Sequence, residues 1–240
     1  MHTPTSLVTG GSGAIGSALI QLLATQGHKV INLSLDEPSE PLPAVTYCVD
    51  LMDREATART LEQIANEHKV DHLVNNAGIS YQTTIETLSL DRMQQMVEIH
   101  NRAALQCLQA LIPGMKARGY GRIVQIGSRM MLGRQGRLIY SMVKAGLLGM
   151  SRSLALEVAP HGITVNMVSP GPIETPFFRQ VHPPGAEQTM KLLSGIPVGR
   201  IGTAEDVANA VAFFLQPSSG FITGQNLFVC GGGSIGTSNV

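Results

Sequence analysis

Short apolar runs alternate with longer amphipathic runs along the chain, and this alternation is the feature that most restricts its fold. The apolar runs have the length of buried strands, and the amphipathic runs have the period of helices. Such alternation is typical of a parallel sheet with helices on both faces. We therefore expect one α/β domain over residues 1–240, with a doubly wound parallel sheet. Its seven expected strands are residues 6–9, 29–34, 45–49, 72–75, 122–127, 164–169 and 226–230.

The helices expected between these strands follow from helical spacing and from capping residues. Three prolines in residues 35–44 leave little room for a helix, so the connection between the second and third strands should be an extended loop. Thr203 should cap the helix that begins at Ala204. The expected helices are residues 14–25, 54–68, 89–117, 140–159 and 204–215.

Length, charge and cysteine usage narrow the class of protein. A chain of 240 residues without a linker fits one large α/β domain. The 17 Lys and Arg residues balance 17 Asp and Glu residues, so no net charge attracts nucleic acid or an anionic membrane. No secretory leader or run of about 18 apolar residues is visible, so we expect a cytoplasmic protein with a small-molecule partner. Cys48, Cys107 and Cys230 lack paired metal-ligand spacing, so we expect packing roles for them and no metal site.

A glycine-rich turn at residues 9–16 joins the first expected strand to the first expected helix. Gly11-x-Gly13-x-x-Gly16 has the spacing of the dinucleotide fingerprint in the strand–turn–helix context that it requires. Glycines there let the backbone approach a pyrophosphate, whose charge the helix N-terminus holds. The expected sheet is then Rossmann-like. A tight turn without a ligand is the alternative, because a glycine run also occurs at residues 231–233.

The end of the second expected strand bears on the choice between NAD and NADP. An acidic side chain there usually hydrogen-bonds the adenosine ribose, whereas an arginine accepts a 2′-phosphate. No basic residue occupies Gly13, Ser34 or Leu35, and Asp36 and a second carboxylate follow. The pattern favours NAD and leaves NADP possible. Asp36 as a solvated loop residue is the alternative.

Tyr140 and Lys144 lie four residues apart in an expected helix, twelve residues after Ser128. Side chains with this spacing share a helix face, roughly 5–6 Å apart at Cβ. The ammonium would favour a phenolate, which makes the tyrosine usable as an acid or base. A phenol titrates near 10, and each unit of lowering needs about 1.4 kcal/mol, which the lysine and a cationic nicotinamide ring could supply. A chance occurrence of Tyr-x-x-x-Lys is the alternative.

Together these motifs resemble the short-chain dehydrogenase/reductase family over nearly the whole chain. The turn is similar to the family's Thr-Gly-x-x-x-Gly-x-Gly, with Ala14 in place of the middle glycine. Asn-Asn-Ala-Gly at residues 75–78, Asp-Leu at 50–51 and Pro-Gly-Pro-Ile-Glu-Thr at 170–175 resemble further family segments. The resemblance implies an NAD(P)-dependent oxidoreductase that interconverts a secondary alcohol and a ketone by hydride transfer. Within the family the chain is similar to 3-oxoacyl carrier-protein reductases.

The resemblance also implies a catalytic tetrad of Asn101, Ser128, Tyr140 and Lys144. Tyr140 would exchange a proton with the substrate oxygen, which Ser128 would hold. Lys144 would lower the pKa of Tyr140 and bind the nicotinamide ribose, and Asn101 would place a water between Lys144 and solvent. The residues implied to bind the dinucleotide are Gly10, Ser12, Gly13, Ile15, Gly16, Ser34, Asp36, Asp50, Leu51, Asn76, Ala77, Gly78, Tyr140, Lys144, Pro170, Gly171, Ile173 and Thr175.

Residues 176–198 resemble the variable lid that the family folds over its substrate. Phe177 and Phe178 in this segment, with Met130 after Ser128, suggest a largely apolar substrate pocket. Arg137 could meet an anionic group of the substrate there or face solvent.

Two other functions stay open at this point. One is a 3-oxoacyl carrier-protein reductase that uses NADPH, against which the missing basic residue argues mildly. The other is a catalytically silent dinucleotide-binding sensor or scaffold, which leaves the intact tetrad unexplained. The resemblance implies a homotetramer or a dimer. Ala145, Gly146 and Gly149 could let their helix pack closely against a partner subunit or within its own subunit.

Overall fold

Seven parallel strands form one sheet in the order β3-β2-β1-β4-β5-β6-β7. The computed structural model describes residues 3–235, apart from the side chain of Phe177. The expected Rossmann-like fold class is confirmed, and each strand ends within two residues of its expected bounds. The strands are β1 (Thr5–Thr9), β2 (Lys29–Ser34), β3 (Val45–Cys48), β4 (His72–Asn75), β5 (Gly121–Ile126), β6 (Ile163–Pro170) and β7 (Asn226–Val229).

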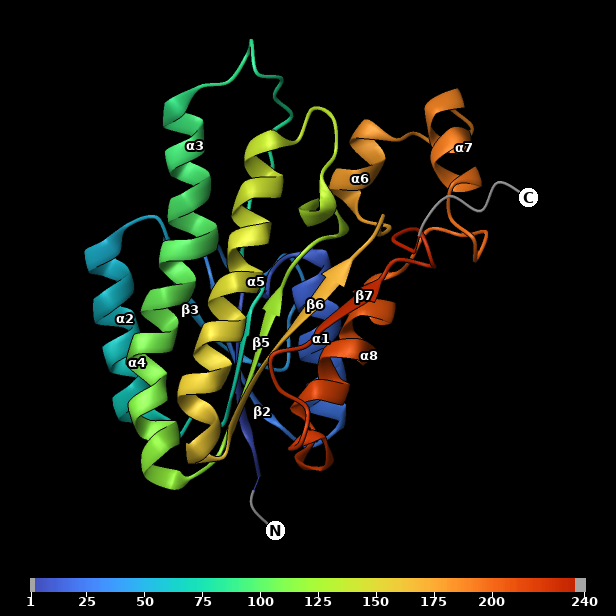
Figure 1. Ribbon diagram of the computed structural model, residues 1–240. Helices are drawn as coiled ribbons and strands as arrows, with labels where there is room; N and C mark the ends of the chain where they lie inside the picture. Colours follow the sequence, from blue (N-terminus) through green and yellow to red (C-terminus); the bar gives the residue numbers. More distant parts are fainter. Residues whose placement is uncertain (1–2, 236–240) are drawn as a thin grey trace.

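Helices cover both faces of the sheet because its strands are apolar on both sides (Figure 1). Leu7 of β1 packs in a core with α2, α4 and α5, whereas the next residue, Val8, packs in a second core with α1 and α8. This alternation follows from the two-residue period of a strand. The helices are α1 (Ala14–Thr25), α2 (Arg54–Glu67), α3 (Leu90–Val97), α4 (Ala103–Arg118), α5 (Leu138–Val158), α6 (Pro176–Val181), α7 (Glu187–Ser194) and α8 (Ala204–Leu215).

Two local expectations are confirmed. Residues 35–44, between β2 and β3, contain no helix. Thr203 caps α8 through a capping box with Asp206, in which each side chain accepts a backbone N–H of the other residue.

The structure differs from expectation in three places. The helix expected over 89–117 is divided by a π-helical segment, Glu98–Arg102, between α3 and α4. Residues 176–198, where none of the expected helices lies, contain the short helices α6 and α7 beyond the carboxyl end of β6 (Figure 1). Cys107 and Cys230 are buried as expected for packing residues, but Cys48 is exposed because β3 is an edge strand.

The strand order places a crevice at the centre of the sheet. β1 lies between β2 and β4, so the connections from β1 and from β4 leave in opposite directions. In open parallel sheets this switch point is where ligands bind, outside the carboxyl ends of the strands. The glycine turn follows β1 at this edge, and the segment at 75–78 follows β4 beside it.

Candidate active site

The glycine turn leaves the N-terminus of α1 open. Gly10 has a φ of +65°, and a Cβ there would lie 2.9 Å from the Cα of Ala77. A Cβ at Gly16 would overlap the carbonyl oxygen of Gly10, so this residue must be glycine for α1 to approach the turn. Gly13 is exposed, caps α1 without a side-chain hydrogen bond and has space for a ligand beside it. The free N–H groups of the first turn, which includes Ile15, therefore suit a pyrophosphate.

Side chains at the end of β2 fix the outer part of this turn. The backbone N–H of Ser12 donates to Oγ of Ser34 at 3.1 Å, and Ser34 donates to Oδ1 of Asn32 at 2.7 Å. Ser12 Oγ donates to the carbonyl oxygen of Asp36 at 2.9 Å. Ser34 is buried, whereas Asp36 is exposed. The rim at the predicted ribose position thus carries hydroxyl groups and a carboxylate.

Asn76 links the two strands on either side of the switch point. Its Nδ2 donates to the carbonyl oxygens of Thr9 and Gly10 at 3.0 and 3.1 Å. The N–H groups of Asn76 and Ala77 both donate to Thr9 Oγ1. The side chain of Asn76 therefore holds the glycine turn in place.

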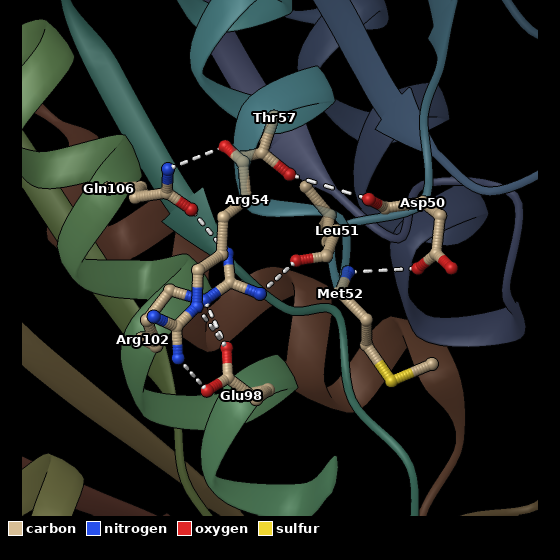
Figure 2. Close-up of polar contacts among 8 residues, drawn as sticks. All are labelled: Asp50, Leu51, Met52, Arg54, Thr57, Glu98, Arg102 and Gln106. Atoms are coloured by element: carbon tan, nitrogen blue, oxygen red, sulfur yellow. Dashed lines mark hydrogen bonds and ion pairs between the residues drawn. The ribbon is translucent and has the colours of Figure 1, made fainter.

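A polar cluster ties Asp50 and Leu51, which are predicted to bind the dinucleotide, to the π-helical segment (Figure 2). Arg102 donates from Nη2 to the carbonyl oxygen of Leu51 at 2.6 Å and from Nε to Glu98 at 2.6 Å. Glu98 also pairs with Arg54 at the start of α2. We call Arg54, Glu98 and Arg102 the arginine clasp. Asp50 accepts the N–H of Met52 at 2.8 Å, which shapes the turn that exposes it.

Ser128 and Tyr140 meet at the carboxyl edge of β5. Ser128 is buried and follows β5, where its Oγ accepts the N–H of Met130 at 3.2 Å. Burial raises the pKa of Tyr140, and a hydrogen bond with Ser128 and the charge of Arg137 oppose this rise. The predicted lowering by Lys144 is not among the causes, so within the protein alone the phenol keeps its proton.

Lys144 lies beneath Tyr140 in the protein interior. Only 3% of it is exposed, and its Nζ donates to the carbonyl oxygen of Ile126 at 2.7 Å. The ammonium is 5.6 Å from the centroid of the Tyr140 ring. Burial lowers the pKa of Lys144 to about 7.

Asn101 and His100 come from the π-helical segment. Asn101 Nδ2 donates to the carbonyl oxygen of Val143 at 3.1 Å, next to Lys144. The His100 ring meets the Tyr140 ring edge-on, with 5.6 Å between centroids and 81° between planes. All four predicted tetrad residues thus converge at this edge of the sheet.

A small buried cavity of about 10 Å³ adjoins Lys144 and His100. Asn75 also lines it, and neither side-chain atom of Asn75, nor Nδ1 of His100, has a hydrogen-bond partner within the described chain. Buried polar atoms are nearly always satisfied, and a volume of this size holds about one water molecule. The cavity therefore suits a single internal water.

The segment at 170–175, which is predicted to bind the dinucleotide, follows β6. Gly171 donates its N–H to the carbonyl oxygen of Val229 at 2.8 Å, just after Pro170. Ile173 is buried in the core with α8, so backbone groups rather than its side chain can face a ligand. Thr175 caps α6 by accepting the N–H of Phe178 at 3.0 Å, which leaves its hydroxyl hydrogen available.

Three of the four residues predicted for the substrate pocket have described side chains. Met130 and Arg137 lie in the sequence between β5 and Tyr140, and both side chains are half-buried. Phe178 of α6 stacks on His182, with 4.5 Å between ring centroids. Phe177 belongs to α6, and its side chain lies outside the described part of the structure.

Sequence reasoning missed His100, Thr9 and Ser80. His100 directly precedes the predicted Asn101, Thr9 directly precedes Gly10, and Ser80 accepts a hydrogen bond from Arg137. Adjacency to a motif was the available signal for the first two residues. Ser80 carries no signal in the sequence, because its contact joins segments far apart along the chain.

Comparisons with known proteins agree with this geometry. A family model described as enoyl-(acyl carrier protein) reductase matches residues 11–234. The 3-oxoacyl-[acyl-carrier-protein] reductase FabG of Escherichia coli is 37% identical over 236 residues, which cover 95% of this chain and 96% of the relative.

Solved structures are similar over the whole chain. Ligand-free aldohexose dehydrogenase AldT of Thermoplasma acidophilum has a TM-score of 0.91 and 29% identity, covering 100% of this chain and 97% of the other. YwfH, described as an NADPH-dependent reductase involved in bacilysin biosynthesis, has a TM-score of 0.88 and 25% identity over 100% of both chains.

The chain belongs to the short-chain dehydrogenase/reductase family. It is an NAD(P)-dependent oxidoreductase that acts on CH–OH and C=O groups. None of the described helices has the length and apolar character that crossing a bilayer requires. Within residues 3–235, no three His, Cys, Asp or Glu side chains are grouped so as to hold a metal ion.

Proposed function

We propose that the protein interconverts a secondary alcohol and a ketone, with Tyr140 as the acid or base. The observation that carries this proposal is the meeting of Ser128 and Lys144 at Tyr140, at the sheet edge beside the glycine turn. In oxidation, Tyr140 in its phenolate form accepts the proton of the substrate hydroxyl as the carbon gives up a hydride. In reduction, Tyr140 returns the proton to the oxygen.

The other residues of the site have separate roles in binding and proton transfer. Ser128 would hold the substrate oxygen, and Lys144 would bind the nicotinamide ribose and favour the phenolate when charged. Asn101 helps to keep a water near Lys144, which the adjoining cavity can hold. A bound nicotinamide dinucleotide supplies the hydride acceptor or donor and, when oxidised, a positive charge.

The remaining dinucleotide contacts are proposed from the placement of the residues. Gly10, Ser12, Gly13, Ile15 and Gly16 would hold the pyrophosphate side. The ribose and adenine side would comprise Ser34, Asp36, Asp50, Leu51, Asn76, Ala77 and Gly78. Pro170, Gly171, Ile173 and Thr175 would hold the nicotinamide.

We propose NAD as the preferred dinucleotide. Ser34 and Asp36 present hydroxyl and carboxylate groups at the predicted ribose position, where a 2′-phosphate needs a cation. Separate calorimetric titrations with NADH and NADPH test this preference. Tighter binding of NADH supports it, and tighter binding of NADPH rejects it.

Tyr140→Phe tests the proposed reaction. The variant removes the transferable proton and keeps the ring that packs against His100. Turnover of ketones should fall by roughly 10²–10⁴-fold, with the dissociation constant for the dinucleotide nearly unchanged. Near-normal turnover would refute the role of Tyr140, and failure to bind either dinucleotide would refute the function as a whole.

A 3-oxoacyl carrier-protein reductase that uses NADPH is the second candidate. The 37% identity to FabG over 95% of this chain favours it. Preference for NADPH together with turnover of 3-oxoacyl thioesters would establish this candidate over the first.

The assembly, lid and location are proposals too. Leu105 on α4 and Met142 and Leu156 on α5 are 45%, 45% and 81% exposed, which supports association into a homotetramer or dimer. Residues 176–198 would act as the lid of a single domain spanning residues 1–240, in a cytoplasmic protein.

A further inference from the structure

Arg137 is held at the mouth of the site by two separate elements. It is the N-cap residue of α5, three residues before Tyr140. Its Nη1 donates to Oγ of Ser80 at 2.9 Å, in the connection that follows β4. A bridge between Thr83 and Arg137, with the Thr83 N–H donating to the carbonyl oxygen of Gly136, joins the same two segments. The guanidinium is therefore fixed in position rather than free in solvent.

Arg137 has no carboxylate partner within the described residues, a property that it shares with Arg122 and Arg129. Arg54, Arg102, Arg118, Arg179 and Arg200 each form an ion pair with Asp or Glu. Within the described residues, Arg137 forms none and makes one side-chain hydrogen bond, although a guanidinium has five N–H donors.

Burial makes this arrangement costly for the free protein. Desolvation lowers the pKa of Arg137, and the positive charge of Arg134 acts in the same direction, while the Tyr140 phenol opposes them. A half-buried cation without a counter-ion gains strongly from an anion that enters the site. Arg137 caps α5 three residues before Tyr140, so an anion bound to its guanidinium would lie on the same side of the site as the reacting oxygen.

We propose that Arg137 and Ser80 bind a carboxylate of the substrate, so that the substrates are short oxo acids and the corresponding hydroxy acids. This inference rests on the proposed function of the same site. A guanidinium presents two parallel N–H groups that match a carboxylate, and the Ser80 hydroxyl can donate its own hydrogen while it accepts from Arg137. A neutral alcohol or a thioester carries no charge near its reacting carbon and gains nothing from this contact.

Matched substrate pairs test the proposal. The substrates are 2-oxobutanoate, 3-oxobutanoate and 4-oxopentanoate, each beside its methyl ester, with the preferred reduced dinucleotide in excess. Each pair differs in one negative charge, and the series varies the distance from the ketone to the carboxylate. The wild-type protein is compared with Arg137→Gln, Arg137→Lys and Ser80→Ala, and with Arg134→Gln as the exposed-arginine control.

The expected result is a preference for at least one acid over its ester in kcat/KM by about 100-fold or more. Arg137→Gln should abolish this preference, because kcat/KM should fall much further for the acids than for the esters. Arg137→Lys should keep part of the preference for the acid, and Ser80→Ala should weaken that preference. Arg134→Gln should keep it.

Equal turnover of acids and esters by the wild-type protein would overturn the carboxylate site and leave the oxidoreductase intact. An acid preference that survives Arg137→Gln would also overturn it. If no ketone is reduced, calorimetry of the acids on the dinucleotide-bound protein decides: binding that Arg137→Gln removes supports the site, and absence of binding overturns it. Loss of the proposed function itself would be seen separately, as failure to bind either dinucleotide.

Discussion

At the scale of single residues, His100 supports the position of Tyr140. Burial, together with the charge of Lys144, lowers the pKa of His100 to about 3, so the ring is neutral at physiological pH. Its Nε2 lies 2.7 Å from the carbonyl oxygen of Ile79, which can only accept, so Nε2 carries the hydrogen. The ring is thus fixed against Tyr140 without adding a second charge beside Lys144.

Gly78→Ala should disturb this support. A Cβ at residue 78 would overlap Cε1 of His100 and lie 2.8 Å from its Nδ1. His100 is only 3% exposed, so the ring can move only by displacing its neighbours, including Tyr140. We expect a loss of about 1–3 kcal/mol in the free energy of unfolding and a lower kcat, measured by urea denaturation and ketone reduction.

Gly114→Ala in α4 is the matched control for this substitution. Its added Cβ would meet only the flexible end of Arg118, at 3.1 Å, so the substitution should be neutral or stabilise the helix by up to about 1 kcal/mol. If both variants behave alike, the His100 ring is not held as tightly as the packing implies.

The contrast between Ser128 and Ser80 shows how far the sequence can predict a site. Ser128, Tyr140 and Lys144 were predictable because a serine followed after twelve residues by Tyr-x-x-x-Lys resembles the pattern of one enzyme family. Ser80 and His100 act through contacts between distant segments: Ser80 has no local pattern that indicates its contact, and His100 is marked only by its position next to Asn101. The lowered pKa of Lys144 likewise depends on burial, which the i, i+4 spacing does not reveal.

At the scale of elements, the π-helical segment at Glu98–Arg102 determines how the site is assembled. The extra residue in this turn lets His100 face Tyr140 while Asn101 reaches the carbonyl oxygen of Val143. The arginine clasp secures the two ends of the segment, Glu98 and Arg102, to the connection after β3 (Figure 2). The clasp thereby couples the predicted adenine side of the cleft to the catalytic side.

Arg102→Met should test this coupling. The substitution keeps apolar volume but removes the hydrogen bonds to Leu51 and Glu98, both of which are largely shielded from solvent. We expect a loss of about 1–3 kcal/mol in the free energy of unfolding and a higher dissociation constant for NADH. Urea denaturation and calorimetry measure the two effects.

Arg59→Met is the control, because Arg59 pairs with Glu55 at 3.9 Å on the exposed face of α2. An exposed pair of this kind contributes about 0.5 kcal/mol or less. An Arg102→Met variant with wild-type affinity for NADH would show that the clasp stabilises the fold without acting on the dinucleotide site.

The strands were predictable and the π-helical segment was not, for a physical reason. Buried parallel strands are short apolar runs between turn residues, so β1, β2 and β4 lie close to their expected positions. Residues 89–117 have ordinary helical periodicity, and the π turn arises from hydrogen bonds to residues far away in the sequence. The helices α6 and α7 are too short for periodicity to indicate them.

At the scale of the whole molecule, the active site reduces the stability of the fold. Lys144 lies between α5 and the carboxyl end of β5, where one carbonyl oxygen accepts from its ammonium. Lys144 is only 3% exposed, so folding removes its ammonium from water and lowers the stability of the folded protein whenever the group is charged. The cost should therefore be visible in the pH dependence of global unfolding.

Lys144→Met should flatten that dependence just above neutral pH. Burial lowers the pKa of Lys144 from 10.5 to about 7 in the folded protein. Between these values the unfolded chain binds a proton that the folded chain does not. The free energy of unfolding therefore rises with pH in this range, and the destabilisation by Lys144 is complete below pH 7. The slope is at most about 1.4 kcal/mol per pH unit.

Urea denaturation from pH 7 to 8.5 should show this slope in the wild-type protein and in the control Lys116→Met, which changes an exposed lysine. An unchanged slope in Lys144→Met would mean that Lys144 keeps its proton in the folded protein, and that it can stabilise the Tyr140 phenolate without help from a bound dinucleotide.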